Sequence, residues 1–193
     1  MPTTVTLDVS EVGAKLPITL DGVNTPKAIA AVTEAAQRGA HCKFHRCEPD
    51  PGPGSTGPPY ALLQFTIEGE VSALKSHAHE GNAKISRGSV CLIGGASDLF
   101  ISLARRGEHD GWEGSMTVLG SVAEADLVPF EAKIMALPRH NFTHPDYGTV
   151  SAPFMIELLL APAAPAHVHV LSSPSSFAVS MLDKQLICRL TSK

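Results

Sequence analysis

Short apolar segments separated by glycine-rich or proline-rich turns recur along this chain of 193 residues. In residues 5–9 and 16–20 apolar and polar positions alternate, as they do in strands that bury one face. Further strands are predicted at residues 42–47, 60–67, 89–93, 99–104, 116–122 and 154–160. A chain with so many short strands between turns favours a β-barrel or a β-sandwich.

Two helices are predicted among these strands. Thr25 precedes Pro26, a pair typical of a helix N-cap followed by the first helical residue, and apolar residues then recur at helical spacing until Gly39. A second helix is predicted within residues 123–137. It should start near Pro129, because a proline inside a helix removes a hydrogen bond.

The composition limits the partners that the chain can have. Apolar residues make up 44% of the chain, which is enough for one domain with its own core. Charged residues make up 18% and the net charge is -4, so neither nucleic acid nor an anionic membrane is an expected partner. The longest apolar run, residues 154–164, is shorter than the ~20 residues that a membrane-spanning helix needs. No secretory leader pattern is visible, and a cytoplasmic protein is the default expectation.

Residues 161–165, Ala-Pro-Ala-Ala-Pro, have the composition of a semi-rigid spacer. We therefore predict a domain over residues 1–160 and a linker with a C-terminal tail over residues 161–193. Apolar residues within 177–190 lie near one helical face, so the tail either docks back as an amphipathic helix or remains disordered.

An ordered series of short motifs resembles the cyclophilins. The motifs are Pro26-Lys27-Ala28, Phe44-His45-Arg46, Gln64, Gly88-Ser89-Val90, the segment 97–101 (Ser-Asp-Leu-Phe-Ile) and the segment 118–122 (Val-Leu-Gly-Ser-Val). The resemblance covers most of the predicted domain. It implies a mainly β fold, a closed eight-stranded antiparallel barrel capped by two helices.

The resemblance also implies the roles of particular residues. Arg46 would be the catalytic residue, and Gln64 would orient it or bind the substrate backbone. Phe100 would form the floor of a proline pocket, with Tyr60 and either Leu62 or Ala61 beside it. No cofactor is implied.

The chain departs from the family pattern at several positions near this site. Asp98 stands where the family has glutamine, and Met116 where it has histidine, so both are candidate substrate-binding residues. The loop at 93–96 is shorter than in the family, and Trp112 lies about one position beyond the family tryptophan. Asp98 is also a candidate ion-pair partner for Arg46, which would compete with a substrate for the guanidinium.

The chemistry implied is rotation about an X-Pro peptide bond, whose barrier is ~18–20 kcal/mol. An arginine that donates toward the prolyl nitrogen stabilises the twisted amide. The leading hypothesis is therefore a peptidyl-prolyl cis-trans isomerase acting on proline-containing polypeptides, with full or reduced activity. The alternative is a catalytically degenerate binding module or assembly subunit, which contacts a protein partner through the Pro49–Pro59 loop or the tail.

Two His-x-His pairs raise the question of a metal. His77 with His79, and His167 with His169, would each place two imidazoles on one strand face. Neither pair has further ligands at the spacing of a structural zinc site, so no metal is predicted.

Overall fold

The structure of the chain is a computed structural model that describes residues 3–9, 13–37, 41–53, 59–67, 72–75, 79–137, 139–144, 148–153 and 156–159. The predicted tail over 161–193 and its helix lie outside these residues, as does the central part of the Pro49–Pro59 loop.

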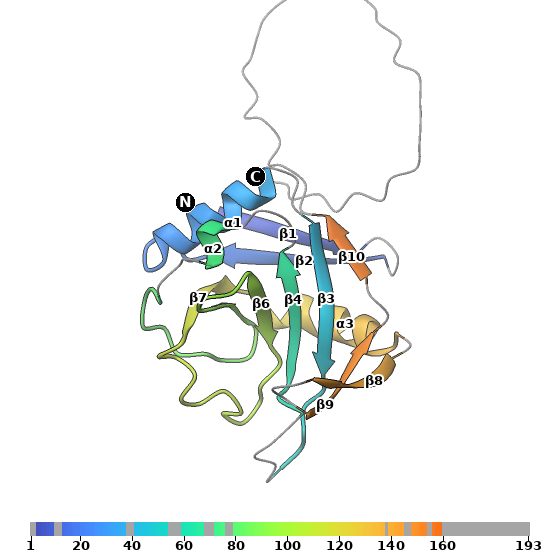
Figure 1. Cartoon of the computed structure of the whole chain (residues 1–193). Helices are drawn as coiled ribbons and strands as arrows, with labels where there is room; N and C mark the ends of the chain where they lie inside the picture. The colour runs from blue at the N-terminus through green and yellow to red at the C-terminus, as the bar shows by residue number, and fades with distance from the viewer. Residues whose placement is uncertain are drawn as a thin grey trace, which may run out of the picture.

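The described residues form ten strands and three helices (Figure 1). The strands are β1 (Thr3–Val9), β2 (Ala14–Leu20), β3 (His41–Glu48), β4 (Leu62–Ile67), β5 (Ser89–Ile93), β6 (Asp98–Ser102), β7 (Met116–Ser121), β8 (Arg139–His144), β9 (Gly148–Pro153) and β10 (Ile156–Leu159). The helices are α1 (Pro26–Gln37), α2 (Ser72–Lys75) and α3 (Glu124–Met135).

Eight strands form one antiparallel sheet in the order β1-β2-β7-β5-β6-β4-β3-β10, and β8 pairs with β9 in a separate hairpin. In Figure 1 β1 and β2 run across the direction of β3 and β4, so the sheet curls around an interior. The two end strands, β1 and β10, contact one another. Within the described residues no hydrogen-bonded ladder joins them. The mainly β fold is thus confirmed, whereas closure of the sheet into a barrel is not.

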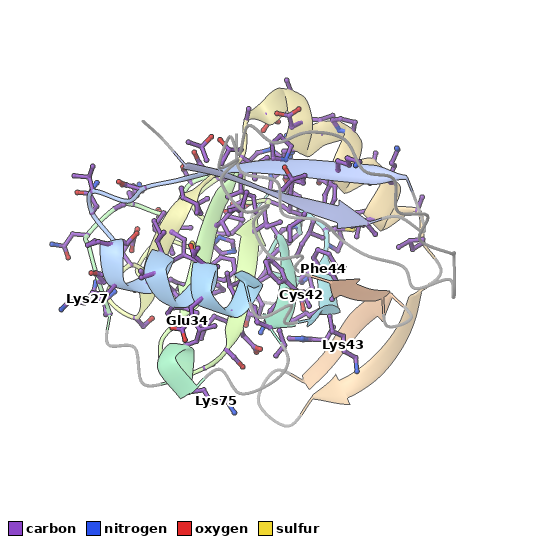
Figure 2. The ribbon with its side chains drawn as sticks, turned by 90° about the horizontal axis from the view of Figure 1, so that it is seen from above. Lys27, Glu34, Cys42, Lys43, Phe44 and Lys75 are labelled. Atoms are coloured by element: carbon purple, nitrogen blue, oxygen red, sulfur yellow. The ribbon has the colours of Figure 1, made fainter. Side chains whose placement is uncertain are left out.

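The core lies on the inner face of this sheet. Phe44 of β3 and Phe65 of β4 are paired across the strands, with ring centroids 5.3 Å apart. Phe130 of α3 approaches Phe44 at 6.5 Å and covers the same interior. Figure 2 shows Cys42 and Phe44 within the packed interior, while Lys43 between them points outward. The period of two along β3 therefore separates a buried face from an outer one.

The helix α1 starts at Pro26, as predicted, but Thr25 does not cap it through its side chain. The Thr25 hydroxyl donates to the carbonyls of Asp21 and Val118 instead. The carboxylate of Glu80 accepts hydrogen bonds from the backbone N–H groups of Lys27 and Ala28, at 3.3 and 2.9 Å. A carboxylate from a distant segment thus satisfies the first donors of the helix, which local sequence cannot reveal.

The helix α3 starts at Glu124, not near Pro129, and Pro129 lies inside it. The prediction of a late start was wrong. Pro129 is exposed, whereas Leu127, Phe130 and Ile134 are buried against the sheet. Burial of that apolar face outweighs the one backbone hydrogen bond that proline removes.

The single-turn helix α2 and the β8–β9 hairpin were not predicted from sequence. Residues 139–144 and 148–153 are mostly polar or small, so no apolar alternation marks them as strands. None of the helices in the described part of the chain combines the length and the apolar character that crossing a bilayer requires.

Candidate functional site

Most of the predicted site residues lie on the outer face of the sheet, in neighbouring register positions. Arg46 of β3 is opposite Gln64 of β4, and Gln64 is opposite Phe100 of β6. Phe100 is in turn opposite Cys91 of β5. Because neighbouring strands are ~4.8 Å apart, the backbones at Arg46 and Phe100 are about 10 Å apart, with Gln64 between them.

A β-bulge at His45 places Arg46 on this face. Phe44 pairs with Phe65 and Arg46 pairs with Gln64, so His45 has no counterpart on β4. Strict alternation would put Phe44 and Arg46 on one face, but the extra residue reverses the order. Phe44 is therefore buried in the core, while Arg46 reaches the outer face.

Arg46 is held by a carboxylate two residues further along the same strand. Its Nε donates to Glu48 Oε1 at 2.7 Å and its Nη2 to Glu48 Oε2 at 3.1 Å. Glu48 Oε2 also accepts the backbone N–H of Tyr60 at 2.6 Å, and the Tyr60 ring lies 5.2 Å from the guanidinium carbon. Arg46 and Glu48 are 5% and 2% exposed, so this is a buried ion pair with two hydrogen bonds in parallel. The expected pairing of Arg46 with Asp98 is wrong, because Glu48 takes that place.

Gln64 connects Arg46 to a second carboxylate. Its Oε1 accepts from Arg46 Nη1 at 3.3 Å, and its Nε2 donates to Asp98 Oδ2 at 3.1 Å. The hydroxyl of Thr66 donates to the other oxygen of Asp98 and lies 3.1 Å from His45 Nδ1. A continuous hydrogen-bonded chain therefore runs from Glu48 to His45 across three strands.

Beside this polar chain lies an apolar cluster on the outer face. Its buried floor consists of Leu62, Ile85, Cys91 and Phe100. The side chains that pack around the floor are partly exposed: Tyr60, Ile93, Trp112, Met116 and Val118. The centroid of the Trp112 ring lies 5.9 Å from that of Phe100 and 5.8 Å from that of Tyr60. Trp112 therefore packs against both Phe100 and Tyr60.

Ala61 links Tyr60 to Leu62 in a backbone conformation that is uncommon for alanine. Its φ is 52°, in the left-handed region, and its carbonyl accepts the N–H of Leu103 at 2.8 Å. A non-glycine residue held in this region costs on the order of 1 kcal/mol. The turn directs Tyr60 toward Trp112 while Leu62 enters β4.

His109 belongs to this site and was not predicted from the sequence. It is 1% exposed and stacks on Trp112, with centroids 4.5 Å apart. Its Nε2 lies 2.7 Å from the carbonyl of Tyr60, and its Nδ1 lies 3.0 Å from the Ser102 hydroxyl. A carbonyl only accepts, so Nε2 carries the proton and the hydroxyl donates to Nδ1. Burial lowers the pKa of His109, which keeps the ring neutral.

Cys91 is a buried member of the apolar cluster, and its thiol is unreactive. Burial raises the pKa of its thiol well above the usual range, so no thiolate forms near neutral pH. Cys42, Cys47 and Cys91 are buried and free of disulfides. Among the described residues, no three histidine, cysteine, aspartate or glutamate side chains gather as metal ligands would.

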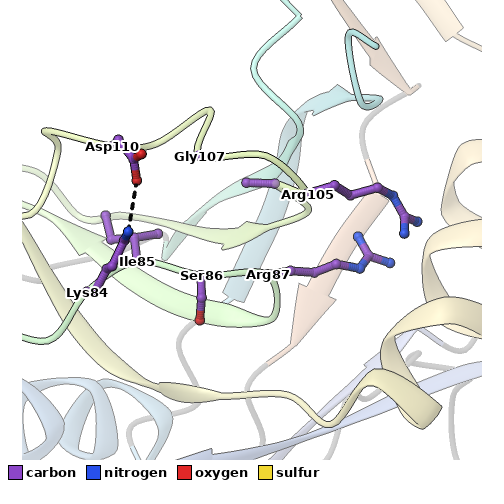
Figure 3. A pocket seen from close by; sticks show the side chains of 8 residues that line it. Lys84, Ile85, Ser86, Arg87, Arg105, Gly107 and Asp110 are labelled. Atoms are coloured by element: carbon purple, nitrogen blue, oxygen red, sulfur yellow. Dashed lines mark ion pairs between the residues drawn. The ribbon is translucent and has the colours of Figure 1, made fainter. Parts of the chain in front are cut away.

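A hollow of about 390 Å³ is lined in part by Ile85, which is also a buried member of the apolar cluster (Figure 3). Its wall includes Lys84, which pairs with Asp110 at 3.4 Å. Arg87 and Arg105 form the side nearest α3, where both pair with Glu131. The cations of this hollow therefore already have acidic partners within the fold.

The structure brings the seven predicted site residues onto one face. Arg46, Gln64 and Phe100 form one row, Leu62 and Tyr60 flank it, and Asp98 and Met116 lie one position further along β6 and β7. Sequence reasoning missed Glu48 and His109. The spacing of Arg46 and Glu48, two residues apart on a strand, could have indicated that they share a face.

Comparison with known proteins identifies no family. No family model matches the chain, and no curated protein matches it. Among solved structures the chain is similar to the one described as the solution structure of the hypothetical protein AF2241 from Archaeoglobus fulgidus. The two share 11% sequence identity with a TM-score of 0.45, over 82% of this chain and 93% of that one.

Proposed function

We propose that this protein is a cyclophilin-like binding module whose outer groove takes proline-containing segments of polypeptides. The observation that carries the proposal is the combination of a partly exposed aromatic cluster with an arginine that is already engaged. Tyr60 and Trp112 surround the buried Phe100, while Glu48 accepts two parallel hydrogen bonds from one edge of the Arg46 guanidinium. The aromatic cluster supplies a binding surface, and Glu48 and Gln64 hold Arg46 through three of its five N–H donors.

Aromatic walls suit a proline ring. Proline-rich segments reach the groove already extended, so they lose little conformational entropy on binding, and their rings pack against aromatic side chains. The groove floor is apolar, and its upper side chains remain partly exposed, including Met116 and Ile93. Phe100 beneath them is 1% exposed, so a pyrrolidine ring would pack on the exposed parts of Tyr60, Trp112 and Met116 and remove them from water.

The state of Arg46 argues for binding without turnover. An isomerase needs a donor aimed at the prolyl nitrogen in a site that excludes water. Here Nε and Nη2 point at Glu48, Nη1 points at Gln64, and the side chain is 5% exposed. Breaking the contact with Glu48 would leave a carboxylate buried without its partner, at a cost of several kcal/mol.

A second candidate function is weak isomerase activity. One observation favours it: Arg46, Gln64 and Phe100 lie in a single row across three strands. We also propose that the sheet closes into the eight-stranded barrel that the resemblance implies, since β1 and β10 contact one another. The groove would then lie on the outer wall of that barrel.

Trp112 allows a direct binding test, because it is the only tryptophan of the chain. Proline-containing peptides should change its fluorescence saturably, and matched peptides with alanine in place of proline should not. Tyr60→Ala and Met116→Lys should each weaken binding. Val128→Ser on α3, at a side chain 49% exposed, is the control and should bind as the wild type does. Equal titrations with proline and alanine peptides would refute the proposal.

A second assay separates binding from turnover. Cis-to-trans rates are measured on X-Pro peptides with the wild type and with Arg46→Ala. A binding module should leave the rate at its uncatalysed value in both cases. Acceleration by the wild type that Arg46→Ala abolishes would replace this proposal by the isomerase candidate.

A further inference from the structure

The β6–β7 loop, residues 103–115, is held against the sheet by a histidine. Of residues 105–115, all of which the structure describes, His109 alone is buried, at 1% exposed. A glycine with positive φ lies on either side of it, Gly107 at 83° and Gly111 at 88°. This part of the loop therefore has one buried anchor between two positions whose backbone adopts conformations closed to most residues.

His109 connects the loop to both neighbours of the apolar cluster. Its Nε2 donates to the carbonyl of Tyr60 at 2.7 Å, and its Nδ1 accepts from the hydroxyl of Ser102, at the end of β6, at 3.0 Å. Its ring stacks on Trp112 with centroids 4.5 Å apart and meets the Phe100 ring edge-on at 5.4 Å. His109 thus fixes the position of Trp112 relative to Tyr60.

These contacts need a neutral imidazole. A protonated ring donates from both nitrogens, so the Ser102 hydroxyl would turn away from Nδ1 and its proton would lose the acceptor that it has here. Ser102 is 0% exposed, so bulk water does not replace that acceptor. The positive charge would itself be buried, which costs more than burial of the neutral ring. Protonation therefore favours a state in which His109 has left its site.

The surroundings of His109 also favour the neutral ring. Burial is the main cause that lowers its pKa, and Arg46 of β3, which pairs with Glu48, acts in the same direction. The bond to the backbone carbonyl and the charge of Glu108 oppose this shift. Asp110, on the other side of the histidine, is exposed and pairs with a lysine. A ring released into water has the ordinary pKa of ~6.5, so acid stabilises the released form relative to the buried one.

We propose that acid releases the β6–β7 loop from the sheet and thereby separates Trp112 from Tyr60, which removes the binding surface that these two side chains form. This inference rests on the proposed function, since it names the regulation of the same surface. The neutral ring of His109 holds the loop closed, and the protonated ring leaves with the loop. The ligand binds the closed form, so its affinity falls with the closed fraction, by up to about tenfold for each pH unit.

Acrylamide quenching of Trp112 fluorescence follows the loop without any ligand, because Trp112 is the only tryptophan of the chain. The pH is lowered stepwise from 7.5 until far-UV circular dichroism reports global unfolding. Trp112 should become more accessible to acrylamide before the circular dichroism changes. His109→Gln keeps a donor for the Tyr60 carbonyl but cannot be protonated, so its Trp112 accessibility should stay constant until unfolding. His79→Gln removes an exposed histidine and should behave as the wild type.

Calorimetric titrations over the same pH range connect the loop to binding. The probe is a proline-containing peptide with blocked ends and no titratable side chain. Its affinity for the wild type and for His79→Gln should fall over the range in which Trp112 becomes accessible, and its affinity for His109→Gln should not. His45, which lies 3.8 Å from Asp98, is the other histidine near this surface. His45→Gln should retain the acid-dependent loss of affinity.

Two results would overturn the inference. Trp112 accessibility that stays constant until global unfolding, or that rises equally in His109→Gln, would show that protonation of His109 does not release the loop. Peptide affinity that stays constant while Trp112 becomes accessible would show that the loop does not control binding. If His109→Gln does not fold, the order of the two transitions in the wild type decides.

Failure of the proposed function gives a different result. If the proline peptide does not bind at pH 7.5, the binding module is refuted. The acrylamide experiment contains no peptide, and it then still decides whether acid releases the loop.

Discussion

The two faces of the central sheet bury different kinds of side chain, although the same strands supply both. On the inner face of β3 and β4, Phe44 and Phe65 pack against each other and against α3. On the outer face of the same strands, Arg46, Glu48 and Gln64 are also nearly fully buried, yet they are polar. Burial of each inner side chain contributes about 1.5–3 kcal/mol, whereas a buried ion pair contributes little beyond its own desolvation. A gain in stability therefore accounts for the apolar side chains of the inner face, but not for the buried polar side chains of the outer face.

The largest effect should follow from truncating the inner face. Phe44→Ala removes a ring that is 0% exposed and contacts two other phenylalanines, so the free energy of unfolding should fall by about 4 kcal/mol. Urea denaturation followed by far-UV circular dichroism measures it. Val128→Ala on the exposed side of α3 is the control and should change it by less than about 0.5 kcal/mol. A loss for Phe44→Ala near that of the control would contradict the assignment of the core.

The next largest loss of stability should follow from removing one partner of the ion pair on the outer face. Removing both partners should cost much less. Glu48→Ala leaves Arg46 buried without its carboxylate and should lower the free energy of unfolding by about 3 kcal/mol. Replacing both groups, as Arg46→Met with Glu48→Leu, should recover most of that loss. A double variant as unstable as Glu48→Ala would show that the pair itself stabilises the fold.

The hydrogen bond between Ser102 and His109, which stacks on Trp112, should contribute less to the free energy of unfolding than the ion pair. Ser102→Ala removes the hydroxyl that donates to His109 Nδ1 and accepts from the backbone N–H of Ala104. Two buried polar groups lose their partner, and the free energy of unfolding should fall by about 1–2 kcal/mol. Trp112 emission should also shift, because His109 stacks on it. Unchanged emission would mean that His109 does not position the tryptophan.

The smallest effect should be a pH dependence from His109. The pKa of an unfolded histidine is ~6.5, and burial lowers the pKa of His109 in the folded protein. As the pH falls below ~6.5, the unfolded chain binds the proton first, so the free energy of unfolding decreases until the folded pKa is passed. Urea midpoints at pH 7.5 and 5.5 should fall more for the wild type than for His109→Gln. An equal fall in both proteins would contradict this assignment.

The sequence predicts most of the fold because its strands are amphipathic or uniformly apolar. The segment 89–93 was predicted to its full extent, and the start of α1 at Pro26 follows from proline chemistry. The β8–β9 hairpin lacks an apolar period, and so its strands were missed. The start of α3 was misplaced because tertiary packing tolerates Pro129 inside the helix.

The sequence predicted which residues belong to the candidate site, but not all of the contacts that they make. The resemblance selected Arg46, Gln64 and Phe100, which the sheet register does align. It did not reveal that Glu48 holds Arg46, since the predicted strand ended at Cys47 and Glu48 lies between that strand and the proline-rich loop. His109 lies in a loop of charged residues and glycines, and only the folding of that loop over the sheet buries it.

The order of the strands has a consequence for how the chain is synthesised. β3 pairs with β4 soon after both have emerged from the ribosome, but its other edge waits for β10, more than a hundred positions later, where Ile156 meets Phe44. Contacts between such distant segments slow folding. Until they form, β3 presents an unpaired edge on which another nascent chain can add a strand. We therefore expect chaperone dependence during synthesis to be concentrated on this edge.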